Sequence, residues 1–143
     1  MSDEGAGGRG QEVGGARLAR YLYAIVRVVP DVERGERFNA GIVLFCRSRR
    51  FLGVRTELDR DKLRAIAPTW NDEALAGQLR SLELVAAGDP AASPLARLEQ
   101  AERFHWLVSP GSTTLQPSVV HSGLTNDPAA DLDRLFRRLV EGS

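Results

Sequence analysis

The hydrophobic pattern in the first half of the chain predicts three β-strands. Residues 21–29 are rich in aromatic and β-branched side chains, and residues 38–46 and 49–55 have the same character. The polar connection over residues 30–37 suits a hairpin loop. The first strand is apolar on both faces except at Arg27, so we expect it to be central and covered on both sides. Three consecutive strands with short connections predict an antiparallel meander.

The middle of the chain has the residues that start and stop helices. Asp59 caps a short helix that Pro68 ends, and Asn71 or Asp72 starts a second helix that Gly88 closes. The second helix carries leucines on one stripe, as a helix packed on a sheet requires. The sequence therefore predicts two helices directly after the meander.

A third helix, two strands and a closing helix follow. Ser93 with the proline after it opens the third helix, which we expect to reach about Arg103. Residues 104–109 and 113–120 are predicted as strands, the second at an edge or with a bulge because it contains Pro117. The last helix begins at Asp127-Pro128 and carries its apolar residues on one stripe: Leu132, Leu135, Phe136, Leu139 and Val140.

These elements predict a single α+β domain. Its antiparallel sheet consists of the three-strand meander plus one or two later strands, packed with three to four helices. Residues 1–16 are rich in glycine and poor in large apolar side chains, which predicts a disordered leader before a domain over residues 17–143. The leader lacks the apolar core of a secretory signal, and no apolar run is long enough to span a bilayer.

Charge and cysteine content exclude several classes of protein. The 19 basic and 19 acidic residues cancel, so the chain carries no strong signal for nucleic-acid binding. The single cysteine, Cys46, excludes an internal disulfide and a multi-cysteine zinc site. No motif predicts a metal or a cofactor. A reducing cytoplasm is the expected compartment.

Two candidate sites lie in the meander. Arg27 sits among apolar neighbours and needs a carboxylate partner, for which Glu36 and Asp31 are the nearest acids in sequence. A structural ion pair or an edge arginine that reaches water is the alternative interpretation of Arg27. Glu36 and Asn39 flank a bend at which Gly41 predicts a bulge or a close backbone approach. They can position a water, a hydroxyl or a metal, or they can satisfy the backbone of the loop.

The third candidate is the polar segment over residues 112–127, which is dense in hydroxyls and amides and has no Lys or Arg. Ser112, Thr113 and Gln116 are its candidate ligand-binding residues, and His121 is its only candidate general base. On a regular strand His121 points away from Gln116 unless a bulge at Pro117 resets the alternation. A hydrogen-bonded structural histidine is the alternative.

Strand ends gather along one rim of an antiparallel sheet, which suggests that the two motifs form a single site. In that hypothesis Glu36 and Asn39 come from one loop, and Ser112, Thr113 and His121 from another. If the rim binds an anion, backbone amides near Gly111 contribute together with the hydroxyls.

The order and spacing of these residues resemble the uncharacterised bacterial family catalogued as domain of unknown function 3037, over about residues 20–141. The matching positions are Tyr21, Tyr23, Arg27, Pro30, Gly35, Glu36, Asn39, Gly41, Ser112, Thr113, Gln116, Ser118, His121, Gly123, Leu124, Asp127 and Pro128. The family pattern has an arginine just before the Ser-Thr pair, where this chain has Gly111. The resemblance implies no activity, but it implies a gene that neighbours a kinase resembling the HipA toxin kinase.

Three functions remain open at this point. The first is a small accessory or binding module, with a HipA-like kinase as its partner. The second is a small hydrolase or phosphate-handling enzyme that uses Glu36, Asn39, Ser112 and His121. The third is a structural interaction protein. An exposed apolar patch favours a module, and polar residues that meet in a concave site favour an enzyme.

Overall fold

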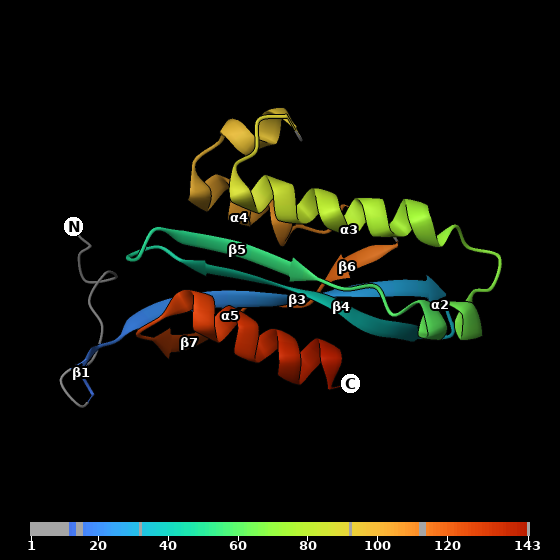
Figure 1. Cartoon of the computed structure of the whole chain (residues 1–143), viewed down its shortest axis with the longest axis horizontal. Helices are drawn as coiled ribbons and strands as arrows, with labels where there is room; N and C mark the ends of the chain where they lie inside the picture. The colour runs from blue at the N-terminus through green and yellow to red at the C-terminus, as the bar shows by residue number, and fades with distance from the viewer. Residues whose placement is uncertain (1–11, 14–15, 32, 92, 112–113, 143) are drawn as a thin grey trace.

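The first three long strands form the predicted meander (Figure 1). β3 (Ala19–Asp31), β4 (Glu36–Cys46) and β5 (Phe51–Thr56) pair antiparallel in the sheet order β5-β4-β3. The computed structural model describes residues 12–13, 16–31, 33–91, 93–111 and 114–142.

Two short strands complete this sheet on the free side of β3. β6 (Leu115–Pro117) pairs with Val26–Val28, and β7 (His121–Thr125) pairs with Ala19–Tyr23. They therefore act as two halves of one edge strand. In the part of the chain before β3, β1 (Glu12–Val13) and β2 (Ala16–Arg17) form a separate two-stranded sheet.

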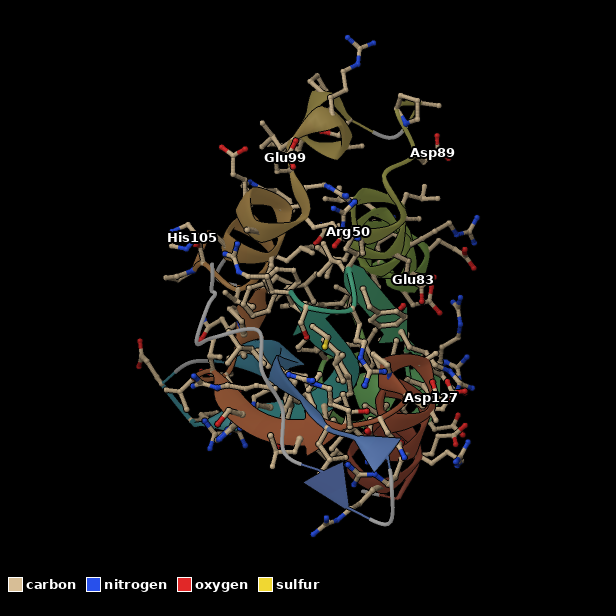
Figure 2. The ribbon with its side chains drawn as sticks, turned by 90° about the vertical axis from the view of Figure 1, so that its left-hand side faces the viewer. Arg50, Glu83, Asp89, Glu99, His105 and Asp127 are labelled. Atoms are coloured by element: carbon tan, nitrogen blue, oxygen red, sulfur yellow. The ribbon has the colours of Figure 1, made fainter. Side chains whose placement is uncertain are left out.

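Helices cover both faces of the sheet, as Figures 1 and 2 show. One face carries α2 (Arg60–Ile66), α3 (Asp72–Ala87), the short 3-10 helix η1 (Pro94–Arg97) and α4 (Gln100–Leu107). The other carries α5 (Pro128–Phe136), which continues into the π-helical turn η2 (Arg137–Glu141). In Figure 2, Glu83 and His105 lie on the opposite side of the sheet from Asp127, the residue before α5. The α+β prediction is confirmed.

The two faces of the sheet contribute to two separate clusters of buried side chains. Even-numbered residues of β3, such as Val26 and Val28, pack with the α2–α4 layer. Odd-numbered residues, such as Tyr21 and Ile25, pack with the apolar stripe of α5. β3 is thus covered on both faces, as its sequence predicts. No helix in the described ranges has the length and apolar character needed to cross a membrane.

Helix caps confirm the predicted starts and stops. The carboxylate of Asp59 accepts a hydrogen bond from the Lys62 amide, and the Asn71 and Asp127 side chains cap α3 and α5 in the same way. Gly88 ends α3 in the left-handed conformation.

The prediction of a strand over residues 104–109 is wrong, because Phe104–Leu107 lie within α4. Their β-branched and aromatic character is outweighed by packing, since the Phe104 ring stacks on Phe45 of β4 with centroids 5.1 Å apart. The predicted third helix is also shorter than expected. Ser93 does cap a helix, but that helix is η1, which ends at Arg97 before α4 begins.

Two predicted boundaries also shift. The hairpin loop is shorter than residues 30–37, since β3 reaches Asp31 and β4 starts at Glu36. Most of the predicted leader over residues 1–16 lies outside the described residues. Glu12–Val13 and Ala16 are described and take part in the β1–β2 pair.

Gly41 lies at a β-bulge, where the register between β3 and β4 shifts between Val26 and Arg27. A Cβ at this position would lie 2.8 Å from the Thr56 methyl carbon and 3.0 Å from the Arg55 carbonyl oxygen. The predicted close backbone approach is therefore present, between β4 and β5.

Candidate functional site

The face of the sheet toward α5 carries a row of polar side chains on β4, β3 and the two edge strands β6 and β7. The alternation along β3 puts Tyr23 and Arg27 on this face, beside Tyr21 and Ile25 of the α5 cluster. Gln116 of β6 stands opposite Arg27, and His121 of β7 stands opposite Tyr23. On the other side of Arg27, Asn39 of β4 is its partner in register. We call Tyr23, Arg27, Asn39, Gln116 and His121 the polar row.

An extra residue in the edge strand brings Gln116 and His121 onto the same face. Their partners Arg27 and Tyr23 lie four positions apart on β3, whereas Gln116 and His121 lie five positions apart in the chain. The break between β6 and β7 absorbs the extra residue and resets the alternation. Such a reset is the condition under which the sequence allows the two side chains to share a face.

Ser118 holds the edge strand together at the break. Its amide donates to the Ile25 carbonyl oxygen at 2.8 Å, and its hydroxyl accepts from the Ile25 amide at 2.9 Å. The hydroxyl therefore takes the place of a backbone carbonyl in the ladder. Ser118 is buried, and its structural role was not predicted from the sequence. A serine directly after the proline of an edge strand is the signal that was available.

Arg27 has no carboxylate partner among the described residues. Burial and the nearby Arg37 guanidinium lower the pKa of Arg27, and no acidic group offsets them. Glu36, one of the two predicted partners, instead forms an ion pair with Arg34 at 3.3 Å. Asp31, the other, accepts a hydrogen bond from the Arg34 amide. The expectation of a carboxylate at Arg27 is not met in the described part of the chain.

Asn39 has a structural role in the fold. Its side-chain amide donates to the Leu139 carbonyl oxygen at 2.8 Å, which ties β4 to the end of the C-terminal helix. This bond satisfies one of the carbonyls that a helix end leaves without a partner. Asn39 therefore positions η2 against the sheet.

His121 lies against an aromatic ring. Its imidazole is 5.2 Å from the Tyr23 ring centroid with an interplanar angle of 32°, and the side chain is exposed. Tyr23 in turn lies 6.0 Å from Tyr21. Within the described residues no carboxylate or hydroxyl is hydrogen-bonded to His121, so the orienting partner of a general base is missing there.

The hypothesis of one site that contains both Glu36 and His121 is wrong. Glu36 pairs with Asp31 and His121 with Tyr23, so eight residues of β3, or roughly 25 Å of strand, separate them. Arg27, Asn39 and Gln116 do share one level of the sheet. Ser112 and Thr113 lie outside the described residues.

Exposed apolar side chains lie in the break between β6 and β7 and on β7 itself. Val119, Val120 and Leu124 are 74%, 42% and 45% exposed. Leu124 pairs with Arg20, which places it on the α4 side of the sheet, where Trp106 is 43% exposed. We call Trp106, Val119, Val120 and Leu124 the apolar edge.

A depression of about 420 Å³ lies between α4 and β6. Trp106 of the apolar edge lines it. The other lining residues are Val26, Leu107, Ser109, Pro110, Gly111, Leu115 and Pro117. Its walls are mostly apolar. A depression of this composition suits an apolar side chain better than a charged group.

The described residues contain no group of three or more His, Cys, Asp or Glu side chains that could hold a metal ion. Cys46 is buried in the α5 cluster, where it packs as a small apolar residue.

A family profile described as "Protein of unknown function (DUF3037)" matches residues 23–140. The chain belongs to this family. No curated protein and no solved structure matches it. The DUF3037 region contains the whole polar row and the whole apolar edge. The resemblance in the sequence is therefore confirmed, and it brings no activity with it.

Proposed function

We propose that this DUF3037 protein is an accessory binding module that docks on a partner protein through its apolar edge. The observation that supports the proposal is the exposure of Val119 and Val120, in the break between β6 and β7, and of Leu124 on β7. Exposed large apolar side chains that gather in one place are typical of protein–protein contact sites. The depression beside Trp106 adds a pocket for an apolar anchor from the partner.

The geometry favours binding over catalysis. A hydrolase or phosphate-handling enzyme built on Glu36, Asn39, Ser112 and His121 needs those groups within reach of one substrate. Glu36 and His121 pair with positions eight residues apart on β3, and the Asn39 amide is engaged by Leu139. The enzyme alternative therefore lacks its central requirement.

The partner that we propose is a HipA-like kinase encoded next to this gene, which the family resemblance implies. The setting that we propose is the bacterial cytoplasm, consistent with a single, unpaired Cys46.

Co-expression of the chain with the neighbouring kinase, followed by size-exclusion chromatography, tests this function. We expect a complex that the double substitution Val119→Ser/Val120→Ser weakens at least about tenfold, since burying two valines contributes a few kcal/mol. Leu98→Ser is the matched control, because Leu98 is also exposed but lies at the end of η1, near Arg47 and Arg50 of the β4–β5 turn. A complex that forms equally well with the double variant would exclude the apolar edge, and no complex at all would exclude the kinase.

A further inference from the structure

Arg27 and Arg37 form a pair of cations on the α5 side of the sheet. The partner of Arg27 in register is Asn39, and Arg37 lies two residues before Asn39 on β4, so Arg37 is a diagonal neighbour of Arg27. The two guanidinium groups are close enough to repel each other. Phe38 points into the α2–α4 cluster, so the alternation puts Arg37 on the same face as Arg27 and Asn39. Arg27 is half-buried and Arg37 is exposed, so the two side chains differ in their access to solvent.

Among the described residues, no acid forms an ion pair with either guanidinium of this pair. The nearest acids in sequence lie at the β3–β4 turn, where Glu36 contacts the Arg34 side chain and Asp31 accepts a hydrogen bond from the Arg34 amide. The third acid of the turn, Glu33, is exposed. A half-buried guanidinium without a counter-ion is costly, and the repulsion from Arg37 adds to the cost. Two repelling cations without a counter-ion lower the stability of the folded protein. Unfavourable arrangements of this kind are typical of functional sites.

We propose that Arg27 and Arg37 bind a phosphate group on the α5 side of the sheet. A guanidinium presents two parallel N–H donors that match the oxygens of a phosphate. Two cations without an acid match a dianion better than a single carboxylate. Gln116, opposite Arg27 on β6, stands where its side chain can contact the same ligand. This site is separate from the apolar edge, so it does not depend on the proposed function.

Thermal unfolding in increasing inorganic phosphate tests the site, with potassium chloride at equal ionic strength as the reference. At ten times the dissociation constant we expect a rise in Tm of about 3 to 6 °C for the native chain. Arg27→Met and Arg37→Met should lose most of this rise. The control is Arg80→Met, which removes the same charge from an exposed position on α3.

The stability of the variants without phosphate gives a second readout. Arg27→Met should melt at the same temperature as the native chain or higher, since it removes a desolvated, repelled cation. A marked fall in Tm would show that Arg27 is structural, and an equal phosphate response in all variants would show a general salt effect. Either result overturns the proposal.

Two further ligands define the class of anion. Acetate should raise the Tm of the native chain much less than phosphate does, and an equal rise would replace the phosphate assignment with a carboxylate site. The free amino acid phosphoserine tests a phosphorylated group as the source. A response to phosphoserine stronger than that to inorganic phosphate, and lost in Arg27→Met, supports a phosphorylated partner. The reverse order supports the free anion.

Discussion

At the scale of single residues, two side chains take the place of backbone hydrogen-bonding groups around β3. The hydroxyl of buried Ser118 accepts the Ile25 amide where the edge strand is broken. The side chain of Asn39 binds a carbonyl at the end of the C-terminal helix. These two contacts let an irregular edge and a helix end meet a regular strand without leaving buried polar groups unpaired.

We expect Ser118→Ala to lower the free energy of unfolding by about 1 to 3 kcal/mol, because it leaves the Ile25 amide without an acceptor. Ser122→Ala is the control on the same edge, since Ser122 is exposed, and it should change stability by less than about 0.5 kcal/mol. Urea unfolding measures both. Equal values for the two variants would mean that the hydroxyl bond does not support the edge.

At the scale of elements, close packing between strands constrains the β4–β5 pair. Gly41 sits at the bulge of β4, and its α-carbon hydrogens face the Thr56 side chain and the Arg55 carbonyl oxygen. The bulge also puts Asn39 on the α5 side and Phe38 on the other, which the C-terminal helix and the α2–α4 layer require. The position therefore links the register of the sheet to the helices on both faces.

A pair of glycine substitutions tests this link. Gly41→Ala should destabilise the chain by about 1 to 3 kcal/mol, because the new methyl overlaps Thr56 and the Arg55 backbone. Gly77→Ala should stabilise it by up to about 1 kcal/mol, since Gly77 lies inside α3 with open space around it. Chemical denaturation gives both values. A neutral Gly41→Ala would show that β5 can move away at no cost.

At the scale of the whole molecule, the sheet and its two helical layers begin at β3. Ala19 is the first residue of the large sheet, where it pairs with Thr125 of β7. Arg49 donates to the Arg17 carbonyl oxygen at 2.7 Å, which ties the entry of β3 to the β4–β5 turn. The α5 layer covers the sheet from this end, with Ala19 in its cluster.

We therefore expect a chain that starts at Arg17 to fold with a Tm within about 1 °C of the full chain, because it keeps both contacts. A chain that starts at Tyr21 should melt several degrees lower, since it loses the Arg17 carbonyl and the pairing of Ala19 with Thr125. Circular dichroism melts of the three chains decide this. A large loss in the Arg17 chain would assign the preceding residues to the fold.

The sequence alone determined the features that depend on local physical chemistry. Side-chain type and alternation predicted β3, β4 and β5, and cap residues such as Asp59 and Asp127 marked where helices begin. The apolar stripe of α5 and the edge position of Pro117 likewise follow from the spacing of residues and from the missing proline donor. Each of these signals lies within a few residues of the element that it specifies.

Only the tertiary structure decided the features that depend on distant partners. Residues 104–107 are helical and pack Phe104 on Phe45 of a distant strand, although their own propensity favours a strand. Gln116 and His121 share a face because the break between β6 and β7, where Ser118 is bonded to Ile25, accommodates an extra residue. Glu36, the predicted partner of Arg27, forms an ion pair with Arg34 of the turn and not with Arg27. The energy of a long-range contact depends on which chain segments meet, and no local pattern encodes that choice.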